Sequence, residues 1–415
     1  MNPLIQRKAT TQLFFSTLVL ACIQLSPWAR AVNPPPGGGY PGQNTAEGQN
    51  ALLHLAGGTY NTALGWASLG FNVIGSFNTG VGAATLLTNT ADRNTATGAG
   101  ALVDNAIGFS NTANGAFALF SNTTGSNNTA VGDSALLSNV DSFRNNAFGV
   151  GALSSHVMGN FNNAVGTTAL FADTQGQAND AFGDEALNHN TSGAGNAAFG
   201  DRVLRQNTTG NFNTAFGAGA LPNNTTGSGN IALGDDAGDN VTTANNVICV
   251  GVTGRNMSNT CYIGNIFGTA VDGSPVVIDG SNQLGITASS RRFKEKIRPM
   301  EHASEALLAL KPVTFHYKND PKGTSQFGLV AEEVEKVNPD LIVRDKEGRP
   351  YTVRYDAVNA MLLNEFLKAH RRMAEQDKRV EELTAQLKEQ AAQIEKVSAQ
   401  LELIKPAPQT VMNSQ

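Results

Sequence analysis

The sequence predicts a mainly β protein in which a β-solenoid array, a small α/β domain and a C-terminal coiled coil follow one another. Three observations lead to this prediction. The phrase Asn-x-Ala-x-Gly recurs from Asn44 to Gly234 with a spacing of 17, broken by one spacing of 16, and the copy at Asn78 has glycine in place of alanine. Apolar residues recur every seven positions near the C-terminus, and short strand-like and helix-like segments lie between the two patterns. A unit of this length is too short for a pair of helices and suits one coil of a β-solenoid.

The first segment, residues 1–31, is predicted to be a signal peptide. Arg7 and Lys8 form its charged start, residues 13–25 are mostly apolar, and Ala29-Arg30-Ala31 offers a small-residue cleavage site. A lipoprotein signal ending at Cys22 is the alternative. Both predict an exported protein, extracellular or at the cell surface, with the periplasm as a second location. The apolar run is too short for a membrane span, so no integral membrane segment is predicted in the mature chain.

A Pro/Gly-rich leader, residues 32–43, precedes the array, residues 44–264. We expect each coil to hold two short strands, one at Ala-x-Gly and one at a following Ala-Leu pair, with Ala, Val, Leu and Phe as the inward side chains. Stacked coils align the opening asparagines into a hydrogen-bonded ladder. These asparagines are Asn44, Asn61, Asn78, Asn94, Asn111, Asn128, Asn145, Asn162, Asn179, Asn196, Asn213 and Asn230.

Such coils bury only a few apolar side chains each, so they need neighbours. Three chains packed side by side would bury a second apolar face, which predicts a homotrimer; a single-chain solenoid with capped ends is the alternative. In repeat style the array resembles the head domains of trimeric autotransporter adhesins, although its period is longer than is usual there.

Charge and chemistry limit what the array can do. Residues 32–288 carry 5 Lys and Arg against 15 Asp and Glu, and residues 289–415 carry 21 against 19. Neither balance supplies the basic stripe that nucleic acid requires, so no nucleic-acid partner is predicted. The acidic residues mostly follow the repeat glycine, as Asp133 does, and His156 and His189 are interpreted as single loop histidines without partners at metal-ligand spacing. No metal, cofactor or multiple-turnover activity is therefore predicted, and a surface glycan or host surface ligand is the candidate ligand class.

Two cysteines, Cys249 and Cys261, lie near the end of the array. They stand two and three residues before a glycine, respectively, and with a side-chain period of two they should face opposite sides of stacked strands. We expect two buried thiols rather than a disulfide.

Beyond the array, residues 265–288 form a predicted β-rich connector, with strands at residues 276–280 and 283–286. The next domain, residues 289–360, is expected to contain helices at residues 303–310 and 331–337 and strands at residues 313–317, 326–330 and 351–355. A long helix is expected to start near Asp356 as its N-cap.

A coiled coil is predicted over residues 361–405, followed by a disordered tail, residues 406–415. The complementary heptad positions hold Leu383, Val397 and Ile404, with Gln390 as a polar interruption. The main heptad positions hold Phe366, Met373, Val380, Leu387, Ile394 and Leu401.

The hexapeptide Ser289-Ser290-Arg291-Arg292-Phe293-Lys294 stands between connector and tail, and a serine near a lysine can act as a nucleophile with its own base. With the block from Phe327 to Val334 and the helix start at Tyr355, this order resembles the intramolecular chaperone auto-processing domain of phage endosialidase tailspikes and tail fibres. The resemblance implies a domain that drives trimerisation of the preceding fibre and then cuts itself off.

Carried over, the resemblance makes Ser289 the nucleophile that attacks the carbonyl of Ala288, Lys294 the general base and Arg292 a supporting residue. The cut would be a single-turnover event between Ala288 and Ser289. Ser290 stands where that family usually has aspartate.

The sequence thus predicts an exported, adhesin-like homotrimeric fibre with a C-terminal intramolecular chaperone that cleaves itself off. The alternatives are a phage-derived tail fibre whose array degrades polysaccharide, and an uncleaved structural trimer of the cell envelope.

Overall fold

A computed structural model describes residues 40–268 and 271–404. The predicted signal peptide and disordered tail lie outside the described residues, as does most of the leader. The chain divides into two compact units, residues 1–270 and 271–415, and each is described by itself. Within the described ranges, none of the helices combines the length and apolar character of a membrane span.

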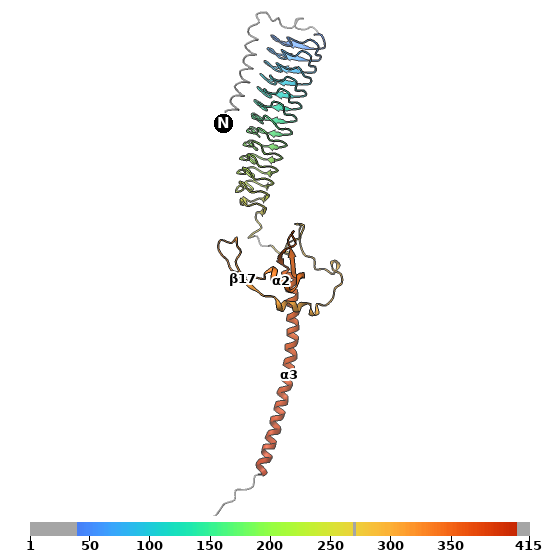
Figure 1. Ribbon diagram of the computed structural model, residues 1–415, viewed down its shortest axis with the longest axis vertical. Coiled ribbons are helices and arrows are strands. Elements are labelled where there is room, and N and C mark those ends of the chain that lie inside the picture. Colours follow the sequence, from blue (N-terminus) through green and yellow to red (C-terminus); the bar gives the residue numbers. More distant parts are fainter. Residues whose placement is uncertain (1–39, 269–270, 405–415) are drawn as a thin grey trace, which may run out of the picture. The chain divides into compact units, whose positions relative to one another are not determined.

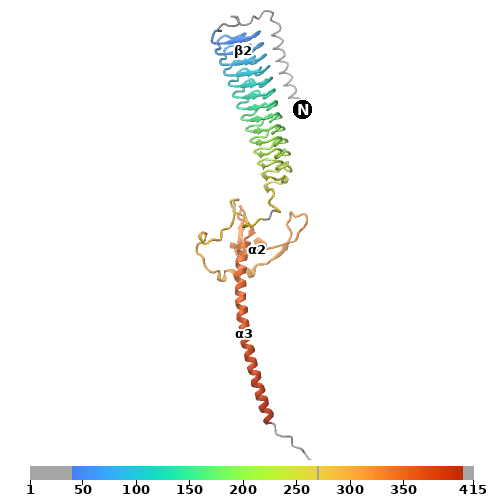
Figure 2. The ribbon, with the colours of Figure 1, turned by 180° about the vertical axis from the view of Figure 1, so that it is seen from behind.

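The first unit is a β-solenoid, as predicted, in which 14 short strands form one parallel sheet in sequence order (Figures 1 and 2). Successive strands pair with their equivalents one repeat away, so that Thr129, for example, lies beside Asn146. The strands are β1 (Thr45–Glu47), β2 (Thr62–Leu64), β3 (Thr79–Val81), β4 (Thr95–Thr97), β5 (Thr112–Asn114), β6 (Thr129–Val131), β7 (Asn146–Phe148), β8 (Asn163–Val165), β9 (Asp180–Phe182), β10 (Ala197–Phe199), β11 (Thr214–Phe216), β12 (Ile231–Leu233), β13 (Val247–Val250) and β14 (Thr260–Ile263).

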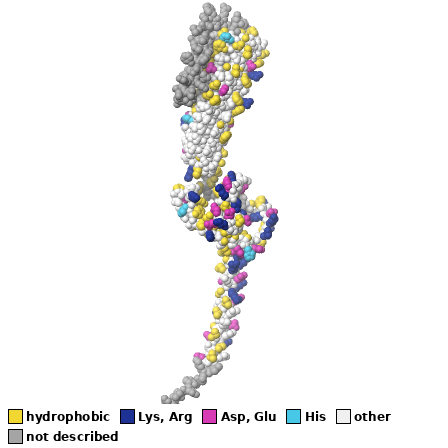
Figure 3. Space-filling model, in the orientation of Figure 1, with side chains coloured by type: hydrophobic (Ala, Val, Ile, Leu, Met, Phe, Trp, Pro, Cys, Tyr) yellow, Lys and Arg dark blue, Asp and Glu magenta, His cyan; other side chains and the backbone are white. Residues whose placement is uncertain are grey.

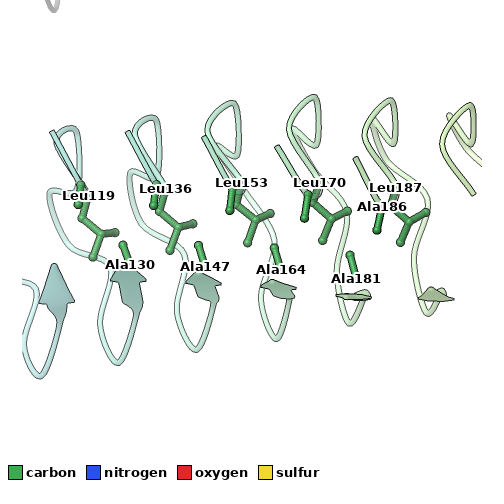
Figure 4. Packing of buried hydrophobic residues seen from close by; sticks show 14 of the residues in the cluster. Leu119, Ala130, Leu136, Ala147, Leu153, Ala164, Leu170, Ala181, Ala186 and Leu187 are labelled. Atoms are coloured by element: carbon green, nitrogen blue, oxygen red, sulfur yellow. The ribbon is translucent and has the colours of Figure 1, made fainter. Parts of the chain in front are cut away.

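Two stacks of small and branched side chains fill the solenoid. The middle residue of most strands is an alanine, such as Ala130 or Ala147, and it points inward with no exposed surface. Opposite each strand lies the leucine of the Ala-Leu pair, such as Leu136 or Leu153, which is also fully buried (Figure 4). Because most coils contribute the same alanine and leucine, the core is continuous along the solenoid.

The prediction of a second strand at the Ala-Leu pair is wrong. The leucines adopt the left-handed region, with φ of 51° at both Leu136 and Leu153, and extended strand pairing requires negative φ. The chain turns there, and the leucine N–H donates to the carbonyl oxygen of the alanine before the next leucine, as from Leu136 to Ala152 at 3.0 Å. Each coil therefore has a single strand.

The phenylalanines also differ from the prediction. Phe148, Phe182 and Phe216 follow the buried alanine and point outward, because side chains alternate along a strand. Their exposed fractions are 41%, 37% and 43%. The core consists mainly of alanine and leucine, with valine at Val203, Val241 and Val247.

The predicted asparagine ladder is confirmed. In Asn128, for example, the Oδ1 atom accepts the backbone N–H of Asn145 at 3.0 Å, and Nδ2 donates to the carbonyl oxygen of Ser142 at 2.8 Å. The single 16-residue step is absorbed in the turn before Asn94, whose N–H still reaches Asn78 Oδ1 at 2.9 Å. The ladder thus satisfies buried polar groups along the array.

The two cysteines face opposite sides of their strands and are both free thiols, as predicted. Cys249 replaces the inward alanine of its strand and is buried, which raises the pKa of its thiol. Cys261 is exposed, so the expectation of two buried thiols holds for Cys249 alone.

The second unit combines three β-hairpins with short helices and one long helix. Its elements are β15 (Val277–Ile278), β16 (Leu284–Gly285), η1 (Arg291–Phe293), η2 (Glu301–Ala309), β17 (Val313–Phe315), β18 (Gln326–Gly328), α2 (Ala331–Val337), η3 (Pro339–Leu341), β19 (Ile342–Arg344), β20 (Pro350–Val353) and α3 (Tyr355–Ile404). The hairpins pair β15 with β16, β17 with β18 and β19 with β20.

Most of the predicted elements of this unit are present with shorter strands. Two differ in kind: η2 is a 3₁₀-helix, and Asp356 lies in the first turn of α3 instead of capping it. Strand β19 was not predicted. A small core of Val334, Leu341, Ile342, Val353 and Met361 joins α2, η3, the β19–β20 hairpin and the start of α3.

Candidate processing and assembly site

The junction hexapeptide forms a tight turn. Ser290 precedes η1, and its carbonyl oxygen accepts the N–H of Phe293 at 3.0 Å, while Lys294 N–H donates to the carbonyl of Arg291 at 3.1 Å. Ser289 and Lys294 therefore flank one helical turn. The peptide between Ala288 and Ser289 lies in an exposed stretch, which leaves it accessible to a nucleophile.

The side chains of the predicted dyad are not joined in the single chain. Ser289 and Lys294 are both exposed, and no hydrogen bond links the serine hydroxyl to the lysine ammonium. Arg292 places its guanidinium 4.7 Å from the ring centroid of Phe293, a cation–π contact that extends along the surface. The turn brings the backbones of Ser289 and Lys294 near each other, but it leaves both side chains exposed to solvent.

A second serine and lysine, which the sequence analysis missed, do meet in this unit. Ser304, on η2, is fully buried; its hydroxyl donates to Glu365 Oε1 at 2.5 Å and accepts from Asn364 Nδ2 at 2.7 Å. Lys368 Nζ lies 3.4 Å from the same hydroxyl and 2.8 Å from Glu365 Oε1. The sequence gives no signal for this cluster, because about sixty residues separate η2 from this part of α3.

The Ser304 hydroxyl donates to Glu365 and not to Lys368, so the lysine does not stand as a base for this serine. The hydrogen bond with Glu365 raises the pKa of Lys368 above its ordinary value, so this lysine keeps its proton at neutral pH. A protonated lysine cannot take the serine proton. The cluster instead fastens η2 to the first turns of α3.

The start of α3 is also fastened to the β17–β18 hairpin. The N–H of Leu329 donates to Tyr355 Oη at 3.1 Å, and a Cβ built on Gly328 would lie 2.9 Å from the same oxygen. This contact connects the two blocks that carried the resemblance in this part of the chain, the Phe327–Val334 block and the Tyr355 helix start.

The helix α3 presents an uncovered apolar stripe (Figure 3). Its main heptad positions from Phe366 to Leu401 are exposed by 60% to 65% in the single chain. Charged side chains alternate with them, among them an i,i+3 pair of Arg379 and Glu382 at 3.5 Å. Apolar residues at heptad spacing with this exposure are typical of a helix that packs against other helices.

Comparison with known proteins identifies the segment that begins at the junction. Residues 289–343 match the family model described as chaperone of endosialidase. No curated protein and no solved structure matches the chain. The match starts at Ser289, the residue at which the sequence analysis placed the start of the chaperone domain. The predicted resemblance to the endosialidase chaperone is therefore confirmed for residues 289–343, which follow a β-solenoid.

Proposed function

We propose that the second unit is an intramolecular chaperone that joins three copies of the chain into a fibre and then releases itself. The observation that carries this proposal is the chaperone-of-endosialidase segment at residues 289–343, placed between a β-solenoid and a helix with an uncovered heptad stripe. The match and the solenoid fit a fibre-like protein that associates with itself.

The stripe on α3 supports association of several copies. Leu387 and Ile394 are each 65% exposed. Covering apolar side chains of this size at every heptad with a second or third helix would stabilise the assembly, because it removes apolar surface from water. In a three-stranded coiled coil, each of the three helices would belong to one of three chains that each carry one array.

The array supports the same assembly through its outward sheet face. In each strand from β6 to β13, the residue after the buried middle position points outward. These residues form the outward stripe, namely Val131, Phe148, Val165, Phe182, Phe199, Phe216, Leu233 and Val250. Phe199 stacks on Phe182 at 4.8 Å and on Phe216 at 4.6 Å between ring centroids, with nearly parallel planes.

The charge distribution favours contact between copies on that face. On the outward positions of these eight strands, Asp180 is the one charged side chain, whereas residues 32–288 carry 10 more acidic than basic residues. Copies with the same net charge repel each other least where an uncharged face meets an uncharged face.

Self-cleavage would then follow assembly. A lysine becomes a general base when burial and neighbouring cations remove its proton, and the single chain leaves Lys294 exposed. Packing of three junctions against one another would supply burial, with Arg291, Arg292 and Lys296 as the neighbouring cations. Ser289 Oγ would attack the carbonyl carbon of Ala288 while its proton passes to Lys294. The C–N bond between Ala288 and Ser289 would then break, and Lys294 would return the proton to the leaving nitrogen, which becomes the amino group of Ser289. Water would hydrolyse the ester left between Ala288 and Ser289 Oγ, which frees the Ala288 carboxylate and restores the serine hydroxyl.

The mature array would be an adhesive or structural rod outside the cytoplasm, with a surface glycan or host surface molecule as its candidate ligand. The likeness to a chaperone of tail fibres fits such a location, and the predicted signal peptide supports it.

Cleavage is tested by native and denaturing mass measurement of the purified wild-type chain and of Ser289→Ala and Lys294→Ala variants. We expect wild type to give two fragments that meet between Ala288 and Ser289, and both variants to give intact chains that still assemble. Ser290→Ala is the matched control and should still be cut. Intact wild-type chain in the assembled protein would contradict self-cleavage. It would favour the alternative function, an uncleaved structural trimer of the cell envelope.

Assembly is tested separately with Leu387→Asn, compared with Lys388→Asn on the neighbouring surface position. In an uncut Ser289→Ala background, we expect Leu387→Asn to shift the native mass from trimer toward single chains and Lys388→Asn to leave the trimer unchanged. Equal masses for the two variants would contradict a coiled coil through α3.

A further inference from the structure

A second polar ladder, not predicted from the sequence, runs inside the array. Its members lie three residues after each buried leucine, and all of them have no exposed surface. In a regular rung the amide Nδ2 donates to Oδ1 of the preceding coil, as from Asn122 to Asn105 at 2.6 Å and from Asn207 to Asn190 at 2.8 Å. The ladder consists of Asn72, Asn89, Asn105, Asn122, Asn139, His156, Asp173, Asn190, Asn207 and Asn224.

Two neighbouring rungs depart from asparagine, and they depart together. His156 Nδ1 lies 2.7 Å from Asp173 Oδ2, and both side chains are fully buried. His156, interpreted from the sequence as a single loop histidine, is therefore a buried residue with a carboxylate partner. An aspartate cannot donate to the preceding coil as asparagine does, and here the histidine donates to the aspartate instead, so the direction of this rung is reversed.

The acceptors around the imidazole ring define its protons. His156 Nε2 lies 2.8 Å from the carbonyl oxygen of Gly159, which can only accept, so Nε2 carries a proton. Asn145 Nδ2 is 3.4 Å from the same nitrogen but has its own acceptor, the Gly159 carbonyl at 3.0 Å. The carbonyl of Gly159 thus receives both N–H groups.

The other side of the pair is a carboxylate. Asp173 Oδ1 accepts from Asn190 Nδ2 at 2.8 Å and from the N–H of Gly176 at 3.1 Å, and Oδ2 faces His156 Nδ1. Because Nε2–H is donated to Gly159, the 2.7 Å hydrogen bond between Nδ1 and Oδ2 requires a second proton between these two atoms. The pair therefore holds one proton more than a neutral histidine beside a carboxylate.

The reversed rung leaves one buried polar atom without a hydrogen bond. Asn139 Oδ1 is buried and has no hydrogen-bond partner, because His156 uses both ring nitrogens elsewhere. In a regular rung this oxygen would accept from the asparagine of the next coil. Among the described residues, the titratable groups that face one another here are His156 and Asp173, and the groups around them are the amides of Asn145 and Asn190 and backbone of Gly159 and Gly176.

We propose that His156 and Asp173 form a proton-retaining rung that makes the stability of the central coils depend on pH, with a maximum in mildly acidic solution. The folded rung holds one titratable proton. In an unfolded chain a histidine loses its proton above about pH 6.5 and an aspartate gains one below about pH 3.9. Folding therefore takes up a proton above about pH 6.5 and releases one below about pH 3.9, so stability falls on both sides of this window.

The repeat itself supplies the matched variant. His156→Asn together with Asp173→Asn restores the regular ladder, including a donor for Asn139 Oδ1, and removes both titratable groups. Asp173→Asn alone lets a neutral His156 accept from the new amide at Nδ1, so protonation of the histidine becomes unfavourable and the variant should lose stability in acid. His156→Asn alone sets an amide oxygen against the Asp173 carboxylate, so that variant should be least stable at neutral pH.

The experiment is hydrogen exchange measured by mass spectrometry on the full chain between pH 5 and pH 8.5, corrected for the intrinsic exchange rate. We expect protection of residues 145–178 in wild type to fall by up to about tenfold per pH unit above pH 6.5 relative to the double variant, because one proton is linked to opening. Residues 213–234, in the regular part of the array, should show no such difference. Identical pH profiles for wild type and double variant in residues 145–178 would overturn the proposal.

A second measurement reads the protons directly. In the full chain labelled with ¹⁵N-histidine, the magic-angle-spinning signal that His156→Asn removes should show both ring nitrogens protonated at pH 7. A signal of a neutral imidazole would overturn the proposal even if exchange is too slow to follow.

Discussion

The hydroxyl of Tyr355, the first residue of α3, accepts the backbone N–H of Leu329 at 3.1 Å. This one bond joins the long helix to the hairpin β17–β18, 26 residues earlier in the chain. The helix that presents the heptad stripe is thus held at its base by the segment that the endosialidase chaperone family shares.

Removing that bond should loosen the hairpin. We expect Tyr355→Phe to lower the free energy of unfolding of the second unit by about 1 kcal/mol, the usual net value of one hydrogen bond. Gly328→Ala should loosen it too, because its Cβ would lie 2.9 Å from Tyr355 Oη. Urea unfolding monitors both, with Tyr351→Phe, at an exposed position, as the control; equal effects of Tyr355→Phe and Tyr351→Phe would contradict the role of the bond.

The contact between η2 and α3 should weaken in acid. The pKa of Glu365 is held below its ordinary value, first by the hydrogen bond with Lys368 and then by that with Ser304. The stabilisation is therefore present above the unfolded-chain pKa of about 4.3 and is lost as pH falls through the lower folded-state pKa.

Hydrogen exchange of residues 301–310 between pH 3 and pH 6, corrected for intrinsic rates, measures this loss. Glu365→Gln should remove the pH dependence and Glu375→Gln, exposed on the same helix, should keep it. A wild-type profile that Glu365→Gln leaves unchanged would show that another group is responsible.

The repeat glycines should resist even the smallest substitution. Gly132 has φ of 133°, and a Cβ there would lie 2.4 Å from the carbonyl oxygen of Gly149 in the next coil. We expect Gly132→Ala to destabilise the array by at least about 1–3 kcal/mol from backbone strain alone. Thermal unfolding checks this against Gly273→Ala, where a Cβ meets no atom within 4 Å; similar melting of both variants would be the contrary result.

The leucine column should carry the stability of the solenoid. Leu136 is fully buried and Leu137 beside it is half-buried, so the pair separates core packing from chain position. We expect Leu136→Ala to cost about 2–5 kcal/mol and Leu137→Ala clearly less. Chemical unfolding of the two variants, followed by circular dichroism, measures the difference, and equal losses would place the core elsewhere.

Much of the fold follows from the sequence because it is periodic. The 17-residue spacing requires equivalent residues to stack, so the order of strands, their register and the ladder from Asn44 to Asn230 could be predicted. Heptad and alternating patterns likewise predicted a long helix starting near Asp356 and continuing as a coiled coil over residues 361–405, where α3 spans Tyr355–Ile404, and most elements before it. The junction residues Ser289 and Lys294 were found from their motif, and their partnership stays a prediction because a single exposed turn does not bury them.

Contacts between different coils and segments were decided by tertiary structure. The left-handed turn at Leu136, which replaces a strand, depends on the N–H of that leucine reaching Ala152 in the next coil. Ser304 and Lys368 are 64 positions apart in the sequence, and only the folded chain brings them together. His156 and Asp173 occupy equivalent positions in neighbouring coils, so stacking of the coils brings them together and buries both. Local pattern records which residues recur, whereas the protonation, burial and partners of a single departing residue depend on what the stacked coils place against it.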